Sequence, residues 1–149
     1  MKLSAHFSLD EFTESDTAKR KGIDNTLPHR LLANAQATAE MMEHIREVLG
    51  GNPVIVTSGY RSMTLNQAIG SSDTSDHVSA LAVDFKCPGF GTPYEVAKHL
   101  STKVTALGIG QLIHEFGSWV HVSTRLPSKA LNRVITISSN GTQVGVHRV

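Results

Sequence analysis

The chain has 149 residues and a net charge of +1, from 14 lysines and arginines against 13 aspartates and glutamates. This length fits one domain over residues 1–149, and the balanced charge predicts neither a nucleic-acid partner nor a disordered acidic tail. Cys87 is the only cysteine, which excludes an intramolecular disulfide and a metal site built from paired cysteines. No apolar run is long enough for a signal peptide or a membrane span, so we expect a chain made in the cytoplasm that inserts into no membrane.

The first long predicted element is a helix over residues 25–49. Asn25 can cap this helix, Pro28 suits its first turn, and apolar residues recur at helical spacing as far as a pair of glycines. A run of β-branched residues then predicts a buried strand over residues 53–58. A polar loop over residues 70–76 follows.

A second strand is predicted over residues 80–85. Alternation places Leu81, Val83 and Phe85 on its apolar face, so Asp84 points to the opposite face together with Ala80 and Ala82. These two small side chains leave room there for a metal ion and a substrate. Two further elements are predicted, to which we assign no chemistry: a helix over residues 93–107 and a C-terminal hairpin over residues 133–146.

A hairpin around Gly117 brings a further histidine into the sheet. In the segment 119–123, alternation puts His121 on the face opposite the valines. A two-residue turn would place His114 across from His121 and turn Glu115 to the other side, whereas a three-residue loop would pair Glu115 with Trp119 on the face of His121. The sequence leaves both registers open.

His77, Asp84 and His121 form a candidate set of metal ligands. Two imidazoles and one carboxylate give zinc three protein ligands and leave a fourth position open for water, as in catalytic rather than structural zinc sites. The chain has eight histidines, so this spacing by itself also fits histidines at the surface or hydrogen-bonded in the core.

Several separated motifs surround these ligands. In order and spacing they resemble the zinc D-Ala-D-Ala carboxypeptidase family, which includes bacterial cell-wall peptidases and phage endolysins and shares its fold with the hedgehog signalling domain. The motifs are Thr57–Ser62, Leu65–Asn66, Gly70–Ser72, Ser75–His77, Ala82–Phe85 and Trp119–His121. The opening segments at 7–12, 15–18 and 22–25 look like the phage-type branch. The resemblance covers residues 7–123.

The resemblance implies a fold and a metal. We expect an α+β fold with a small, largely antiparallel sheet, helices packed on one face and the zinc cleft on the other. One Zn²⁺ per chain would be held by His77, Asp84 and His121. The family usually carries glycine where this chain has Ala80, and alanine is the smallest replacement, so we expect the site to survive with a slightly different turn.

The resemblance also implies roles for three further residues. Glu115 stands at the offset of the site glutamate in hedgehog-type members and would act as the general base, whereas other members place the acid where this chain has Ser118. Arg61 would stabilise the oxyanion or hold a peptide carboxylate, and Ser75 would bind substrate. The alternatives are a solvated strand carboxylate for Glu115, a surface salt bridge for Arg61 and a turn-stabilising hydroxyl for Ser75.

Three functions are compatible with these residues. The first is a zinc peptidase acting on peptidoglycan peptides as a carboxypeptidase or an endopeptidase. In this case we expect a monomeric phage endolysin that is made in the host cytoplasm and acts at the cell wall in the periplasm. The second is a cytosolic dipeptidase that hydrolyses free D-Ala-D-Ala. The third is a non-hydrolytic binding module that contains zinc, as the hedgehog relatives are.

Overall fold

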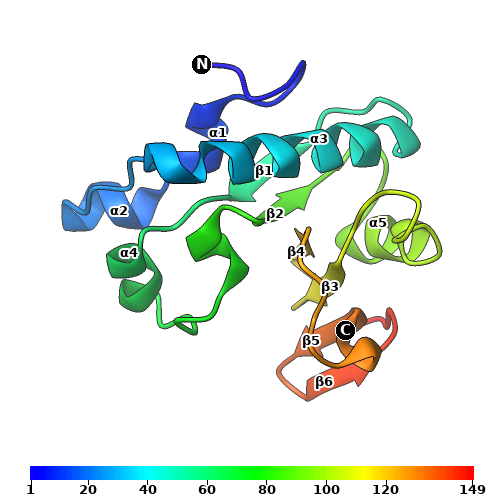
Figure 1. Ribbon diagram of the computed structural model, residues 1–149. Coiled ribbons are helices and arrows are strands. Elements are labelled where there is room, and N and C mark those ends of the chain that lie inside the picture. Colours follow the sequence, from blue (N-terminus) through cyan, green and yellow to red (C-terminus); the bar gives the residue numbers. More distant parts are fainter.

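The fold is organised around a six-stranded sheet in the order β1-β2-β4-β3-β5-β6, as seen in a computed structural model that describes residues 1–149 (Figure 1). All neighbouring strands are antiparallel except β3 and β5, which are parallel. The predicted α+β class with a largely antiparallel sheet is therefore confirmed. The strands are Ile55–Ser58 (β1), Ala82–Lys86 (β2), Gln111–Glu115 (β3), Trp119–Ser123 (β4), Val134–Ser138 (β5) and Gly141–Val144 (β6).

The helices that close the core lie on one face of this sheet. Side chains of α3 and α5 join one cluster of 24 buried residues with the inward-facing side chains of β2 and β4, such as Val83 and Val122. Figure 1 shows α3 crossing the end of the sheet that holds β1 and β2, with α5 beside β3 and β4. The α-helices are Leu9–Thr13 (α1), Asp16–Lys21 (α2), Leu32–Val48 (α3), Met63–Ala68 (α4) and Pro93–Leu100 (α5).

Both predicted long helices were too long. The segment before α3 forms a 3-10 turn at His29–Leu31, and Asn25 caps no helix because its side chain bonds to backbone groups of Thr13, Tyr60 and Ser62 instead. The second predicted helix, over residues 93–107, is α5, which begins at Pro93 but ends at Leu100. There the Ser101 hydroxyl donates to the Lys98 carbonyl, which competes with the helical pattern.

Two strand predictions also need correction. The strand predicted over 53–58 as buried is β1, which starts at Ile55, pairs only with β2 at the sheet edge and leaves Ile55 52% exposed. The second strand begins at Ala82, so Ala80 is not part of it. Ala80 has φ 58° and packs in the hydrophobic core, so only Ala82 contributes the small side chain expected beside Asp84.

Ala80 adopts a left-handed backbone conformation, which glycine adopts more easily than any other residue. Its φ of 58° and ψ of 30° are left-handed, and it ends the 3-10 helix Asp76–Ser79 that carries His77. For a residue with a Cβ this conformation costs about 1–2 kcal/mol. The Ala80 carbonyl accepts the Thr38 hydroxyl at 2.8 Å, which ties the turn to α3.

Three short helices, α1, α2 and α4, were not predicted, although each carries a capping residue. Ser8 and Glu11 form a capping box at the start of α1, and Ser15 and Ser62 cap α2 and α4. A serine followed three residues later by a glutamate is a sequence signal for a helix start, so α1 was within reach of sequence reasoning.

The C-terminal hairpin of β5 and β6 is confirmed. It joins the sheet through parallel pairing of β5 with β3, which the local pattern does not specify. None of the helices is both long and apolar enough to cross a lipid bilayer.

Candidate metal centre

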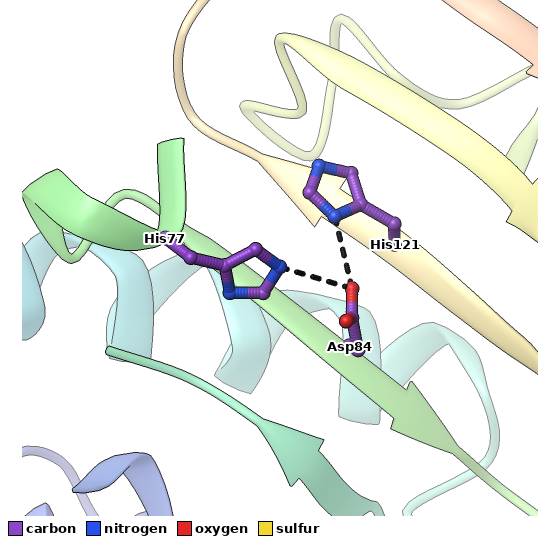
Figure 2. Close-up of side chains that lie close together, drawn as sticks. All are labelled: His77, Asp84 and His121. Carbon is purple, nitrogen blue, oxygen red and sulfur yellow. Dashed lines mark hydrogen bonds and ion pairs between the residues drawn. The ribbon is translucent and has the colours of Figure 1, made fainter. Parts of the chain in front are cut away.

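His77, Asp84 and His121 meet on the face of the sheet opposite α3 and α5. His77 comes from the 3-10 helix Asp76–Ser79, whereas Asp84 and His121 are direct cross-strand partners in β2 and β4. Figure 2 shows both imidazole rings directed at the Asp84 carboxylate. All three side chains are buried, and one ligand atom from each lies within 4.8 Å of the others.

The contacts within this metal group converge on one oxygen. Asp84 Oδ1 lies 3.2 Å from His77 Nε2 and 2.9 Å from His121 Nδ1 (Figure 2). The two rings are edge to face, with centroids 5.1 Å apart. Two nitrogens and a carboxylate oxygen are thus gathered from segments far apart in the chain before any ligand binds.

A backbone carbonyl orients the His77 ring. His77 Nδ1 lies 2.6 Å from the Gly59 carbonyl, to which it donates its hydrogen, so the lone pair of Nε2 faces Asp84. This arrangement is typical of metal-binding histidines, whose second nitrogen bonds to a carbonyl or carboxylate. Gly59 is required there because a Cβ would lie 2.6 Å from the Phe12 carbonyl oxygen.

The protonation tendencies of the three residues differ. Burial lowers the pKa of His77 and outweighs the opposing effect of Asp84. The lowered pKa favours the neutral imidazole. Burial alone would raise the pKa of Asp84, but the two histidines overcome it and hold this pKa below its usual range. For His121 burial is likewise outweighed, because its hydrogen bond to Asp84 and the nearby carboxylates raise its pKa.

Glu115 lies on the same face as the metal group, as the three-residue loop requires. The ladder pairs Glu115 with Trp119, and the loop residues Phe116 and Gly117 both have positive φ, at 55° and 65°. Glu115 Oε1 is 3.8 Å from His121 Nδ1. Burial and the charge of Asp84 raise the pKa of the Glu115 carboxyl, as is found for many general bases.

The rival residue, His114, points to the other side of the sheet. It pairs with Val120, is fully buried and bonds through Nδ1 to the His147 carbonyl at 2.9 Å. It takes no part in the metal group.

Arg61 extends along the edge of the metal group. Its Nη2 lies 3.5 Å from Asp84 Oδ2, its Nε donates to Ser58 Oγ at 3.2 Å, and its Nη1 donates to Asn66 Oδ1 at 3.2 Å. The side chain is 12% exposed, which excludes the alternative of a surface salt bridge. Sequence reasoning did not assign Ser58 or Asn66 a role, although both lie inside the motifs around Arg61.

Arg61 also lines a cleft beside the metal group. This cleft has a volume of about 350 Å³, and Trp119 and Ser58 line it together with residues 14–17. A larger hollow of about 550 Å³ lies between α1 and α2, and none of His77, Asp84 and His121 lines either cavity. Ser75 stabilises the turn before His77, because its hydroxyl oxygen accepts the His77 amide at 3.3 Å.

The donor set fits a zinc ion. Two imidazole nitrogens and a carboxylate are ligands that zinc accepts, and with three protein ligands one coordination position stays open. His77 Nε2 and the Asp84 carboxylate oxygen lie 3.2 Å apart, so one cation could bind to both atoms. Glu115 and Arg61 lie beside the group.

Comparison with known proteins places this geometry in a family context. Residues 5–123 match the model of a family described as Peptidase M15. The match contains every side chain of the site and ends at Ser123, before β5 and β6. None of the curated proteins matches this chain.

Proposed function

The chain belongs to the Peptidase M15 family, and from this premise we propose that it hydrolyses amide bonds in the stem peptides or cross-links of bacterial peptidoglycan. M15 peptidases are zinc enzymes, and the family supports a zinc peptidase acting on peptidoglycan-like substrates in general. We further propose that at least one of the two residues joined by the cleaved amide is D-configured, as for a D-Ala-D-Ala carboxypeptidase or endopeptidase. The observation that carries it is the buried His77, Asp84 and His121 group, with Glu115 and Arg61 in contact with its members.

We propose that His77, Asp84 and His121 hold one zinc ion per chain. A bound zinc ion would lower the pKa of a water molecule to about 7 and polarise the carbonyl of the scissile amide. Glu115 would accept the proton of the attacking water and return it to the leaving amine. Glu115 Oε1 lies 3.8 Å from His121 Nδ1, so Glu115 is a neighbour of the metal group rather than one of the three ligands.

Arg61 would act on the substrate oxygen. Its guanidinium is a donor with several N–H groups in a fixed plane, which suits both an oxyanion and a terminal carboxylate. Ser58, Asn66 and Asp84 hold this group from three sides, so it is positioned before the substrate arrives. Ser75 remains a proposed substrate contact, since its hydroxyl hydrogen is not used in the bond to the His77 amide.

We further propose that the chain acts as a phage endolysin at the cell wall. The support is the phage-type pattern of the opening segments, among them the residues around Phe12 and Asn25, which the structure places against the segment that carries Arg61. A monomer made in the host cytoplasm and released to the periplasm would meet its substrate there.

The test is mass spectrometry of purified Gram-negative peptidoglycan after incubation with the zinc-loaded protein, with a chelator-treated sample as control. We expect chelator-sensitive loss of D-Ala or a cut at one kind of stem-peptide bond. Free D-Ala-D-Ala is tested in parallel, because hydrolysis of the dipeptide alone would make the chain a dipeptidase. If zinc is bound and both substrates stay intact, the chain is a binding module and the proposal is wrong.

A further inference from the structure

Asn25 lies in the segment between α2 and the 3-10 turn His29–Leu31, and its carboxamide is buried and fully bonded. Its Nδ2 donates to the Thr13 carbonyl at 2.8 Å and to the Tyr60 carbonyl at 3.0 Å. Its Oδ1 accepts the Ser62 amide at 2.7 Å. One side chain therefore bonds the backbone on both sides of Arg61.

The backbone that Asn25 holds belongs to no strand or helix. Residues 59–61 lie between the end of β1 and Ser62, which caps α4, and they belong to no strand or helix. Their polar groups are paired with distant segments instead: the Tyr60 amide donates to the Phe12 carbonyl at 2.6 Å, and the Arg61 amide donates to the His77 carbonyl at 3.1 Å. The position of Arg61 thus depends on side-chain and loop contacts rather than on the sheet.

Asn25 also supports the partner of the Arg61 guanidinium. The Ser62 amide that it bonds belongs to the residue that caps α4, since Ser62 Oγ accepts the Leu65 amide at 3.1 Å. The next residue of α4, Asn66, accepts the Arg61 Nη1 hydrogen at 3.2 Å. The backbone of Arg61 and one of its side-chain partners are therefore both connected to the carboxamide of Asn25.

We propose that Asn25 is a positioning residue for Arg61. It fixes the Tyr60–Ser62 backbone so that the guanidinium meets the substrate oxygen in the cleft beside the metal group. This inference rests on the proposed function, since Arg61 is the group that would contact the substrate. A carboxamide is suited to the task, because it supplies two donors and one acceptor in a plane without adding a charge next to Arg61.

The test is a double-mutant cycle in the full-length, zinc-loaded protein, using Asn25→Ala, Arg61→Ala and the combined variant on peptidoglycan peptides. We expect Asn25→Ala to lower kcat/KM by about tenfold to a hundredfold with unchanged zinc content, as for other misplacements of an active group. The combined variant should be no slower than Arg61→Ala alone. Asn25→Asp keeps the acceptor for the Ser62 amide and provides a second variant if Asn25→Ala does not fold.

A matched control separates positioning from stability. Asn52 also donates its Nδ2 to a backbone carbonyl, that of Leu49 at 2.7 Å, but lies away from the metal group. Asn52→Ala should reduce the free energy of unfolding without changing kcat/KM. The inference is overturned if Asn25→Ala behaves like Asn52→Ala, or if the losses from Asn25→Ala and Arg61→Ala multiply in the combined variant.

A second readout does not depend on turnover. The NMR signal of the Arg61 Nε–H group reports its hydrogen bond to Ser58, and we expect Asn25→Ala to shift and broaden it while Asn52→Ala leaves it unchanged. If the wild-type protein cleaves no peptide, the proposed function fails, yet this signal still decides whether Asn25 positions Arg61. An unchanged Arg61 signal in Asn25→Ala would overturn the inference.

Discussion

The two faces of strands β2 and β4 differ by a single residue step and have opposite tasks. On one face Val83, Phe85 and Val122 pack against the helices, where only shape and apolar area matter. On the other face Asp84 and His121 are also buried, but they are charged or polar and bonded to each other. The apolar face therefore stabilises the fold, whereas the polar face depends on atom positions that the fold must hold.

The largest expected effect comes from removing a ligand on the polar face. His77→Ala or His121→Ala should bind no zinc and should fall to the activity of the chelator-treated protein, because two ligands cannot retain the ion. The measurement is zinc content by atomic absorption together with turnover of peptidoglycan peptides. His29→Ala removes an exposed histidine and should change neither. Full zinc occupancy in both ligand variants would disprove the assigned site.

Glu115→Gln should separate chemistry from metal binding on the same face. We expect one zinc per chain as in the wild type, with kcat lower by about a hundredfold to ten-thousandfold, because an amide cannot accept the proton. Glu47→Gln, at an exposed position of α3, is the matched control. A variant that turns over at the wild-type rate would assign the base elsewhere.

Phe85→Ala tests the apolar face next to Asp84. It should reduce the free energy of unfolding by about 3–5 kcal/mol, the usual cost of deleting a buried phenyl group. Urea denaturation measures the loss, with Phe116→Ala as control because Phe116 is 50% exposed. The folded fraction should still bind zinc, and a loss of zinc in protein shown to be folded would mean that the two faces are not independent.

The smallest expected effect is at the turn between the ligands. Ala80→Gly relieves about 1–2 kcal/mol of left-handed strain, but it removes a buried methyl group and loosens the unfolded chain, which together cost a similar amount. We therefore expect the shift of the thermal midpoint to correspond to a change of less than about 1 kcal/mol in the free energy of unfolding. A larger change in either direction would show that Ala80 does not hold the left-handed conformation.

Much of the site followed from the sequence because it depends on local alternation. The parity of β2 and β4 placed Asp84 and His121 on one face, and the structure confirms it. The choice between Glu115 and His114 did not follow, because a hairpin register depends on a loop whose residues allow both lengths. The positive φ values of Phe116 and Gly117 decide it, and phenylalanine is not a residue that signals such a conformation.

The support around Arg61 could not be predicted for a different reason. Asn25 precedes a proline and an apolar helical pattern, so its local sequence favours a helix cap. Its actual partners are backbone groups of Thr13, Tyr60 and Ser62, two of them more than thirty residues away. Local propensity carries no information on such partners, which only the packed fold brings together.

The strand order has a consequence for the synthesis of the chain. Because β4 lies between β2 and β3, the polar face of β2 stays open until the β3–β4 hairpin is added to it as a unit. His77 and Asp84 emerge from the ribosome long before His121, and on their own they supply two of three ligands. A zinc ion would therefore meet its third protein ligand only after the β3–β4 hairpin has joined β2, and occupancy of the site would report that the sheet has closed.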